Sequence, residues 1–134
     1  MASIFTKIIA REIPGEIVYE DDHAIAFLDI APKSEGHTLV VPKVEVASFG
    51  DLPADVLPPL MAAIQKVARG VAQAMGTPHY NVTLNNGPPA GQVVFHVHFH
   101  IMPRWEGQPL ARPPLSLPKE RMAEIGAAIR TAIG

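Results

Sequence analysis

The alternation of polar and apolar positions is clearest over residues 95–104 (FHVHFHIMPR), where histidines and apolar side chains take turns. Successive side chains of a strand point to opposite faces, so a period of two is typical of a strand with one buried face. Shorter segments of strand-like composition precede it, and residues that favour turns separate them. The predicted strands are residues 16–20, 24–28, 38–41, 79–84 and 95–104.

Two longer segments carry apolar residues at every third or fourth position, which is the spacing of one helix face. In residues 51–76 these positions are Leu60, Ile64, Val67, Val71 and Met75, followed by Gly76 as a typical helix end. In residues 117–133 they are Met122, Ile125, Ile129 and Ile133, with Ser116 placed to cap the helix.

Two further features refine the helices. Residues 3–10 are predicted to form a short helix that Ser3 caps. Pro58 and Pro59 are predicted to break or restart the 51–76 helix, because an interior proline costs about 3 kcal/mol.

These elements predict an α+β fold: a five-stranded, mostly antiparallel sheet with a long mid-chain helix and short terminal helices. Hairpins and loops join most of the strands, which is why the sheet should be mostly antiparallel. We treat residues 1–134 as one domain, since that length is sufficient for one core.

Composition excludes several classes of function. The chain has no cysteine, so it has no disulfide, thiolate metal site or cysteine nucleophile. Lysines and arginines are scattered singly and the net charge is −2, which argues against nucleic acid as a partner. No apolar run approaches the roughly 20 residues of a membrane helix, and the first residues do not resemble a signal peptide. We therefore expect a cytoplasmic protein that contacts no membrane.

Three of the six histidines, His96, His98 and His100, occupy alternate positions of the 95–104 strand and should share one face. A purely structural role is the less favoured interpretation, because clustered imidazoles repel one another when protonated and need partners when neutral. A metal site is the second interpretation. His96 and His100 would lie roughly 13 Å apart at ~3.3 Å per residue, so one ion would need two of the three histidines and a residue from elsewhere.

Nucleophilic catalysis is the third interpretation, and it uses all three histidines. A neutral imidazole attacks phosphorus well, and flanking imidazoles can position a phosphate or protonate a leaving group. The preceding loop, residues 85–91, is rich in glycine, asparagine and proline. Its backbone N–H groups could bind anionic oxygens.

The segment His96-Val97-His98-Phe99-His100-Ile101-Met102 resembles the signature of the histidine triad (HIT) family. The resemblance extends over residues 3 to about 105. Other matching segments are Ile4-Phe5, Glu12-Ile13-Pro14, Ala26-Phe27-Leu28-Asp29-Ile30, Gly36-His37-Thr38-Leu39-Val40-Val41-Pro42-Lys43 and Ala90-Gly91-Gln92.

The resemblance implies a nucleotide hydrolase or transferase that acts at the α-phosphate and needs no metal or other cofactor. It implies that His98 is the nucleophile, which forms a nucleotidyl-histidine that water then hydrolyses. His96 and His100 would flank the nucleophile, with His100 at the phosphate or the leaving group. His37 matches the upstream histidine that lies beside the triad.

The resemblance also implies a binding site for a purine nucleotide. Asp29 matches the position that binds the ribose hydroxyls, and Asn85 and Gln92 match positions that contact phosphate. The base pocket would be lined by Phe5, Ile4, Phe27 and Ile30. Homodimers are usual in the family, so a homodimer is expected.

This chain departs from the family pattern at three places. Ser3 and Thr6 replace a Cys-x-x-Cys that joins histidines in a structural zinc site of some bacterial members, so that zinc is not expected here. Val93 replaces a serine that often binds phosphate in the phosphoramidase branch. The helix over residues 117–133 lies outside the shared core.

The leading hypothesis is a hydrolase of adenosine or other purine nucleotide conjugates: a phosphoramidate, an aminoacyl adenylate or a dinucleoside polyphosphate. One alternative is a nucleotide-binding regulatory module with little turnover. Another is a zinc-dependent hydrolase that uses the histidine strand. The sequence does not identify the leaving group.

Overall fold

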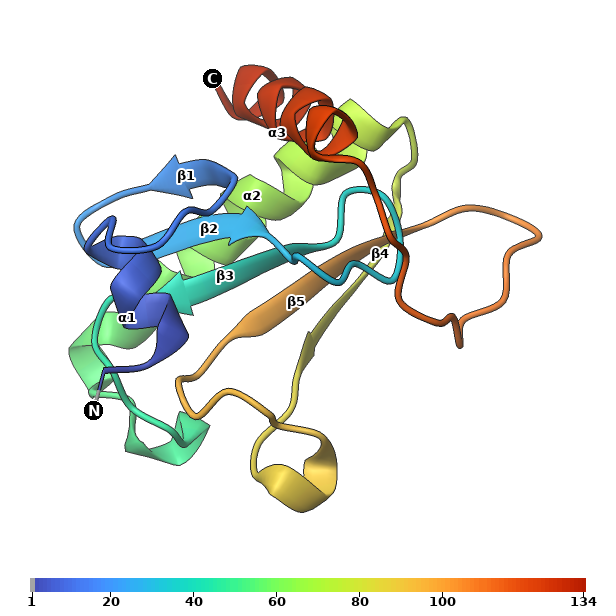
Figure 1. Cartoon of the computed structure of the whole chain (residues 1–134). Helices are drawn as coiled ribbons and strands as arrows, with labels where there is room; N and C mark the ends of the chain where they lie inside the picture. The colour runs from blue at the N-terminus through green and yellow to red at the C-terminus, as the bar shows by residue number, and fades with distance from the viewer. Residues whose placement is uncertain (1) are drawn as a thin grey trace.

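The computed structural model describes residues 2–134 and contains one five-stranded antiparallel sheet with the strand order β1-β2-β3-β5-β4 (Figure 1). The strands are β1 (Ile17–Glu20), β2 (Ala24–Leu28), β3 (Thr38–Pro42), β4 (His79–Leu84) and β5 (Phe99–Arg104). The α-helices are α1 (Ile4–Ile9), α2 (Leu57–Met75) and α3 (Lys119–Ile133). The predicted α+β class and sheet are confirmed.

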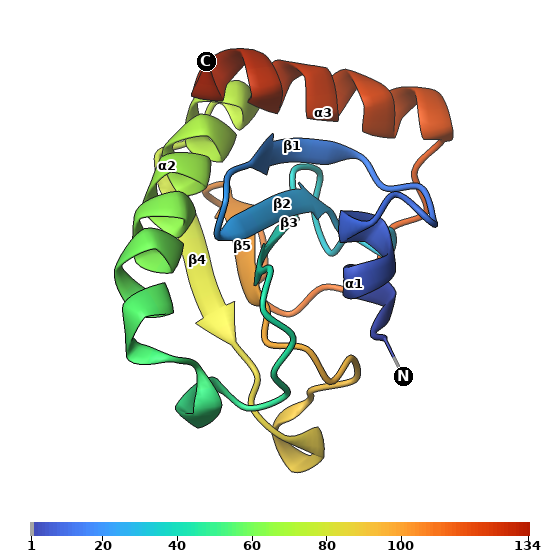
Figure 2. The ribbon, with the colours of Figure 1, turned by 90° about the vertical axis from the view of Figure 1, so that its left-hand side faces the viewer.

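The helices cover opposite faces of the sheet, with α2 on one side and α1 on the other (Figure 2). Side chains of β2 alternate between the two cores: Ala26 and Leu28 pack in the cluster with α2, whereas Ile25 and Phe27 pack in the cluster with α1. This alternation follows from the period of two in a strand. Because both faces are covered, all five residues of β2 are buried.

The mid-chain helix begins later than the pattern predicted. Residues 51–56 do not join α2; two 3-10 turns, Phe49–Asp51 and Ala54–Val56, precede it. Pro58 and Pro59 lie in the first turn of α2, so the prolines mark its start. Backbone N–H groups of a first turn have no partner within the helix, and proline loses nothing there. The predicted end at Gly76 is confirmed by its left-handed conformation.

The last helix, α3, packs against α2 and β1 and buries Ile125 and Ile129, as its spacing predicted. Its start was predicted wrongly: Pro118 is the N-cap residue, and no side chain caps the helix. The residue before a proline is disfavoured in helical conformation, which keeps Leu117 outside. Among residues 2–134, no helix has the length and apolarity that crossing a membrane requires.

The histidine strand is shorter than predicted, because β5 begins at Phe99. His96 and His98 lie in the segment just before it. Pro42 ends β3 and has no N–H to extend the ladder, and the backbone N–H of Val97 instead donates to the carbonyl of Val46 at 2.8 Å. The opposite face is as predicted, since Val97, Phe99 and Ile101 are buried in the core with α2.

Candidate active site

Strand register places His100 at the centre of the sheet, between Leu39 of β3 and Thr83 of β4. Leu39 belongs to the core on the α1 side, so His100 and its neighbours on the same face lie on that side of the sheet. Two cavities meet at this point, and both are lined by His98, His100, Asp29 and Val93. The sheet therefore brings the predicted nucleophile and its neighbour to the junction of the two cavities.

The first cavity, which we call the apolar cavity, has a volume of about 190 Å³ and lies between α1 and the sheet. The ring of Phe5 packs edge-on against His98, with centroids 5.0 Å apart, and lies tilted against the ring of Phe27, with centroids 5.4 Å apart. Ile30 is 84% exposed and forms part of the rim. All five predicted residues of the base and ribose site line this cavity: Ile4, Phe5, Phe27, Asp29 and Ile30.

The second cavity, which we call the polar cavity, has a volume of about 450 Å³. Besides the four shared residues, it is lined by Ala31, Lys33, His37, Thr83, Asn85, Gly91 and Met102. The structure thus places His37 and Asn85 beside the triad, as expected. It also adds Lys33 and Thr83, which the sequence did not single out.

Hydrogen bonding fixes the tautomer of His98. Its Nδ1 lies 2.8 Å from the carbonyl oxygen of His96, and a carbonyl can only accept. Nδ1 must therefore carry the proton, which leaves the lone pair of the neutral ring on Nε2. His98 is 6% exposed and lines both cavities. A neutral imidazole held in this way is a preorganised nucleophile.

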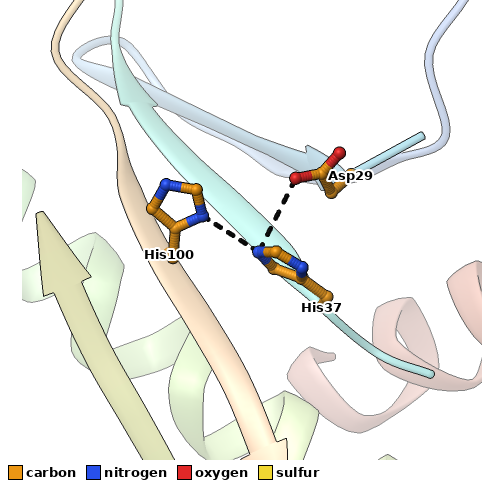
Figure 3. Close-up of side chains that lie close together, drawn as sticks. All are labelled: Asp29, His37 and His100. Carbon is orange, nitrogen blue, oxygen red and sulfur yellow. Dashed lines mark hydrogen bonds and ion pairs between the residues drawn. The ribbon is translucent and has the colours of Figure 1, made fainter. Parts of the chain in front are cut away.

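His37 and His100 form an imidazole pair, with His37 Nε2 2.9 Å from His100 Nδ1 (Figure 3). The backbone N–H of Lys33 donates to His37 Nδ1 at 3.1 Å, so the neutral ring carries its proton on Nε2 and donates it to His100. His100 consequently carries its own proton on Nε2. That atom is buried and has no hydrogen-bond partner among the described residues. The pair therefore leaves the buried Nε2–H of His100 without a partner among the described residues.

Burial keeps these rings neutral. Desolvation, with a smaller contribution from the neighbouring His37 and His98, lowers the pKa of His100 from 6.5 to about 4. Burial also lowers the pKa of His37, although Asp29, whose Oδ2 lies 3.6 Å from His37 Nε2, opposes the shift. At neutral pH Asp29 therefore contacts a neutral His37 ring.

His96 is fully buried and lines neither cavity. Its Nε2 donates to the carbonyl of Pro42 at 2.8 Å, so its Nδ1 accepts from the Ser3 hydroxyl at 2.7 Å. Glu45 completes this cluster by accepting from the Ser3 backbone N–H and the Thr6 hydroxyl. Through this cluster, His96 attaches its own segment, which also contains His98, to the start of α1.

The same cluster does not suit the structural zinc that the resemblance implies for some bacterial members of the family. Zinc sites of that type are built from thiolates and imidazoles. Here the two cysteine positions are hydroxyl side chains, Ser3 and Thr6, and both are already hydrogen-bonded within the cluster. The residues present do not fit that ion.

Gln92 takes a different role from the predicted phosphate contact. It is buried, lines neither cavity, and its amide makes three internal hydrogen bonds. Its Oε1 accepts from the Gly87 N–H at 2.8 Å, and its Nε2 donates to the carbonyls of Ala47 and Val94. We therefore assign Gln92 to the support of the 85–94 loop. Asn86 of the same loop accepts from the Phe49 N–H at 2.7 Å.

Residues from the C-terminal part of the chain bind the loop that carries Asp29, Lys33 and His37. The Leu115 N–H donates to the Pro32 carbonyl at 2.6 Å, and Arg121 of α3 binds Glu35 with two nitrogens, at 2.7 and 2.9 Å. No local sequence signal pointed to these partners, because each contact joins residues more than 80 positions apart.

Residues 2–134 contain one group of possible metal ligands: Asp29, His37 and His100 each offer a ligand atom, and the three atoms lie within 4.8 Å of one another. The set differs from the predicted metal site, since it takes only one histidine from the triad. Its two histidine nitrogens are the ones that share the hydrogen bond of the pair. An ion there would have to displace the His37 Nε2 proton.

Comparisons with known proteins identify the family of the chain. The family model described as "HIT domain" matches residues 10–107. An uncharacterized HIT-like protein of Methanocaldococcus jannaschii is 51% identical over 78% of this chain and 80% of its own length. A Hit-like protein of Bartonella henselae, known from a crystal structure, superposes with a TM-score of 0.89 at 42% identity, covering 97% of this chain and 95% of that one.

Some relatives have names that state an activity. The adenosine 5′-monophosphoramidase HNT1 of Saccharomyces cerevisiae is 45% identical over 77% of this chain and 63% of its own length. The adenylylsulfatase HINT3 of Arabidopsis thaliana is 37% identical over 87% of this chain and 62% of its own length.

Proposed function

The chain belongs to the histidine triad (HIT) family, and on this premise we propose that it hydrolyses purine nucleotide conjugates at the α-phosphate through a nucleotidyl-His98 intermediate. One observation carries the proposal: the carbonyl of His96 holds Nδ1 of His98, which leaves the Nε2 lone pair at the junction of the two cavities. The names of the yeast and Arabidopsis relatives support an adenylate as the substrate.

The two cavities suggest how the substrate is bound. The apolar cavity takes the base against the side chains of Ile4, Phe5 and Phe27. The Asp29 carboxylate, which also lines this cavity, accepts hydrogen bonds from the ribose hydroxyls. The α-phosphate then lies at the junction, beside His98 and His100. The group on the far side of the phosphorus extends into the polar cavity.

The reaction proceeds in two displacements. His98 Nε2 attacks the phosphorus, the bond to the leaving group breaks, and that group takes the electron pair. Water then attacks the phosphorus of the nucleotidyl-histidine and loses one proton to the solvent. The bond from phosphorus to His98 Nε2 breaks, Nε2 takes back the electron pair, and the nucleoside monophosphate leaves. His100 donates its Nε2–H to a phosphate oxygen, where negative charge develops, and His37 keeps that proton in place. No step requires a cofactor.

We also propose that the protein is a homodimer. Strand β4 lies at the edge of the sheet, with its outer backbone groups unpaired. Tyr80 and Val82 of this strand are 40% and 43% exposed. An exposed edge with apolar side chains is a ready surface for pairing with a second copy. Sedimentation equilibrium tests this: a dimer mass supports the proposal, and a monomer at all concentrations contradicts it.

A zinc-dependent hydrolase is the second candidate, and the convergence of Asp29, His37 and His100 favours it. Zinc would take the nitrogens that now share a hydrogen bond, and it would compete with the ribose for Asp29. Metal analysis of active protein separates the two candidates. Stoichiometric zinc, with activity lost to a chelator, supports the second; full activity without metal supports the first.

Turnover of matched adenylates tests the leading proposal. The wild type and His98→Ala should be assayed with adenosine 5′-phosphoramidate, diadenosine polyphosphate and an aminoacyl adenylate. We expect turnover of at least one by the wild type and none by His98→Ala, with AMP binding largely retained. Binding without turnover by the wild type would instead favour a regulatory module.

A further inference from the structure

The polar cavity contains a cation that the proposed chemistry does not yet use. Lys33 lines this cavity together with His37, His100 and Thr83. None of the ion pairs among residues 2–134 involves Lys33. The charge of Lys33 also acts on the imidazole pair. Burial is the largest cause of the lowered pKa of His37 and of His100, and Lys33 is among the neighbouring charges that lower both values further. Lys33 is an exposed residue of the cavity wall, and its charge lies close enough to act on the pair.

The other charged groups of the cavity do not neutralise this lysine. Asp29 is the one carboxylate among the lining residues, and its Oδ1 accepts the Ala31 N–H at 2.9 Å. In the proposed complex the Asp29 carboxylate also binds the ribose. The remaining polar groups, from Thr83 and Asn85, are uncharged. The subsite beyond the phosphate thus has an unpaired positive charge.

We propose that the polar cavity is the subsite of the leaving group and that Lys33 makes it select an oxyanion, such as sulfate, phosphate or carboxylate, over an amine. This inference rests on the proposed function and specifies its substrate class. As the bond from His98 Nε2 to phosphorus forms, the phosphorus–oxygen bond breaks and the leaving oxygen takes the electron pair. Lys33 then stabilises the negative charge that develops on that oxygen.

The protonation states of His37 and His100 also favour an oxyanion over an amine as the leaving group. An amine that leaves with an electron pair needs a proton, whereas sulfate leaves as an anion without one. Near neutral pH the pair of His37 and His100 is neutral, so it offers N–H donors but no imidazolium proton. An oxyanion matches a site with fixed donors and a cation.

The side chain of Lys33 can be tested separately from its backbone. The hydrogen bond to His37 uses the backbone N–H, so a side-chain substitution leaves that bond in place. Lys33→Met removes the charge and keeps much of the apolar stem, and Lys33→Arg restores a charge. Lys119→Met, at the exposed start of α3, is the control for loss of a lysine elsewhere.

The experiment measures kcat/KM of each variant on substrates with the same adenylyl group: adenosine 5′-phosphosulfate, ADP, an aminoacyl adenylate and adenosine 5′-phosphoramidate. For the oxyanion substrates we expect Lys33→Met to lower kcat/KM about tenfold, because a tenfold effect is the usual size for the loss of one charged hydrogen bond. The phosphoramidate should change less than about twofold, since its leaving group carries no such charge. The individual oxyanion arms identify which one the cavity prefers.

Two further results support a direct charge effect. Lys33→Arg should recover most of the activity on the oxyanion substrates, and the loss in Lys33→Met should shrink as salt is raised, because salt screens exposed charges. An equal change on all four substrates, or no change on any, would overturn the selection while leaving the nucleotidyl-His98 proposal intact. Failure of the wild type to hydrolyse any of them would overturn the proposed function, and the selection with it.

Discussion

Nε2 of His37 lies 2.9 Å from Nδ1 of His100, and the backbone N–H of Lys33 fixes the direction of this hydrogen bond. Because that N–H occupies Nδ1 of His37, the proton of the neutral His37 ring lies between the two histidines. One backbone group in a loop therefore determines which nitrogen of His100, in a different strand, carries a proton. The pair joins the loop that holds Asp29 to the strand that follows His98.

His37→Ala tests whether this pair positions the donor on His100. Removal of the ring leaves His100 free to turn and to change tautomer, so we expect kcat to fall about 10- to 100-fold, as for other groups that orient a functional histidine. KM should change little, because His37 binds neither base nor ribose in the proposed complex. Steady-state kinetics measure both constants. His23→Ala, at an exposed position between β1 and β2, is the control; an unchanged kcat in His37→Ala would contradict the role.

The buried rings predict a loss of stability in acid. The pKa of His100 is about 4 in the folded protein and 6.5 without its surroundings, so only the unfolded chain takes up this proton between those values. The free energy of unfolding should therefore fall as the pH drops from about 6.5 to about 4, by up to about 3 kcal/mol from this group. His37 and His96 shift in the same direction.

Urea titrations across this pH range measure the effect. In His100→Asn the slope of stability against pH should be shallower than in the wild type, since one of the shifted groups is gone. Equal slopes would show that His100 is not held neutral by the fold.

Gly36, which precedes His37, is predicted to stabilise the fold in two ways: it tolerates a positive φ, and it leaves room for a neighbouring side chain. A matched pair of glycine-to-alanine substitutions separates the two effects. Gly36 has φ = +87°, and a Cβ there would lie 2.6 Å from Cγ of Met75. Gly107 has φ = +81° but no atom within 4 Å of the same position. Gly107→Ala should lower the free energy of unfolding by about 1–2 kcal/mol, because only the backbone is strained there.

Gly36→Ala should lower the free energy of unfolding by roughly 1–3 kcal/mol more than Gly107→Ala, because the side chain of Met75 in α2 must also move. Denaturant unfolding compares the two variants. Equal losses would mean that the packing of Met75 adapts without cost.

Asp29→Asn tests the ribose contact. An amide offers a single acceptor oxygen and no charge, so we expect kcat/KM for a ribonucleotide substrate to fall about tenfold, the value of one charged hydrogen bond. The loss should be much smaller for the 2′,3′-dideoxy analogue, which lacks both hydroxyls. A loss of the same size on both substrates would assign Asp29 to the Asp29–His37 contact instead.

The sequence predicted those features that repeat along the chain. Alternation around Phe99 and helical spacing around Val67 identified buried faces correctly, because burial of a face follows directly from the period of the side chains. Element starts were less predictable. β5 begins at Phe99 rather than at residue 95 because Pro42, on another strand, ends the ladder, and α3 begins after Pro118 rather than after Ser116.

Within the site, the family resemblance located the residues that converge, including Asp29 and His37. It did not locate their partners. The amide of Gln92 is used by three backbone groups, and Lys33 acts on His37 through its backbone, which no side-chain pattern records. Such partners depend on how the loops fold together, and single-sequence patterns do not encode that.

Trapping of the covalent intermediate tests the central claim most directly. The wild type is mixed with excess adenylate, quenched in denaturant at alkaline pH within the turnover time, digested, and examined by mass spectrometry. We predict an adenylyl group on His98, present during turnover and absent in His98→Ala. Rapid hydrolysis with no adduct on the 95–104 segment at any time, together with full activity of His98→Ala, would contradict the account.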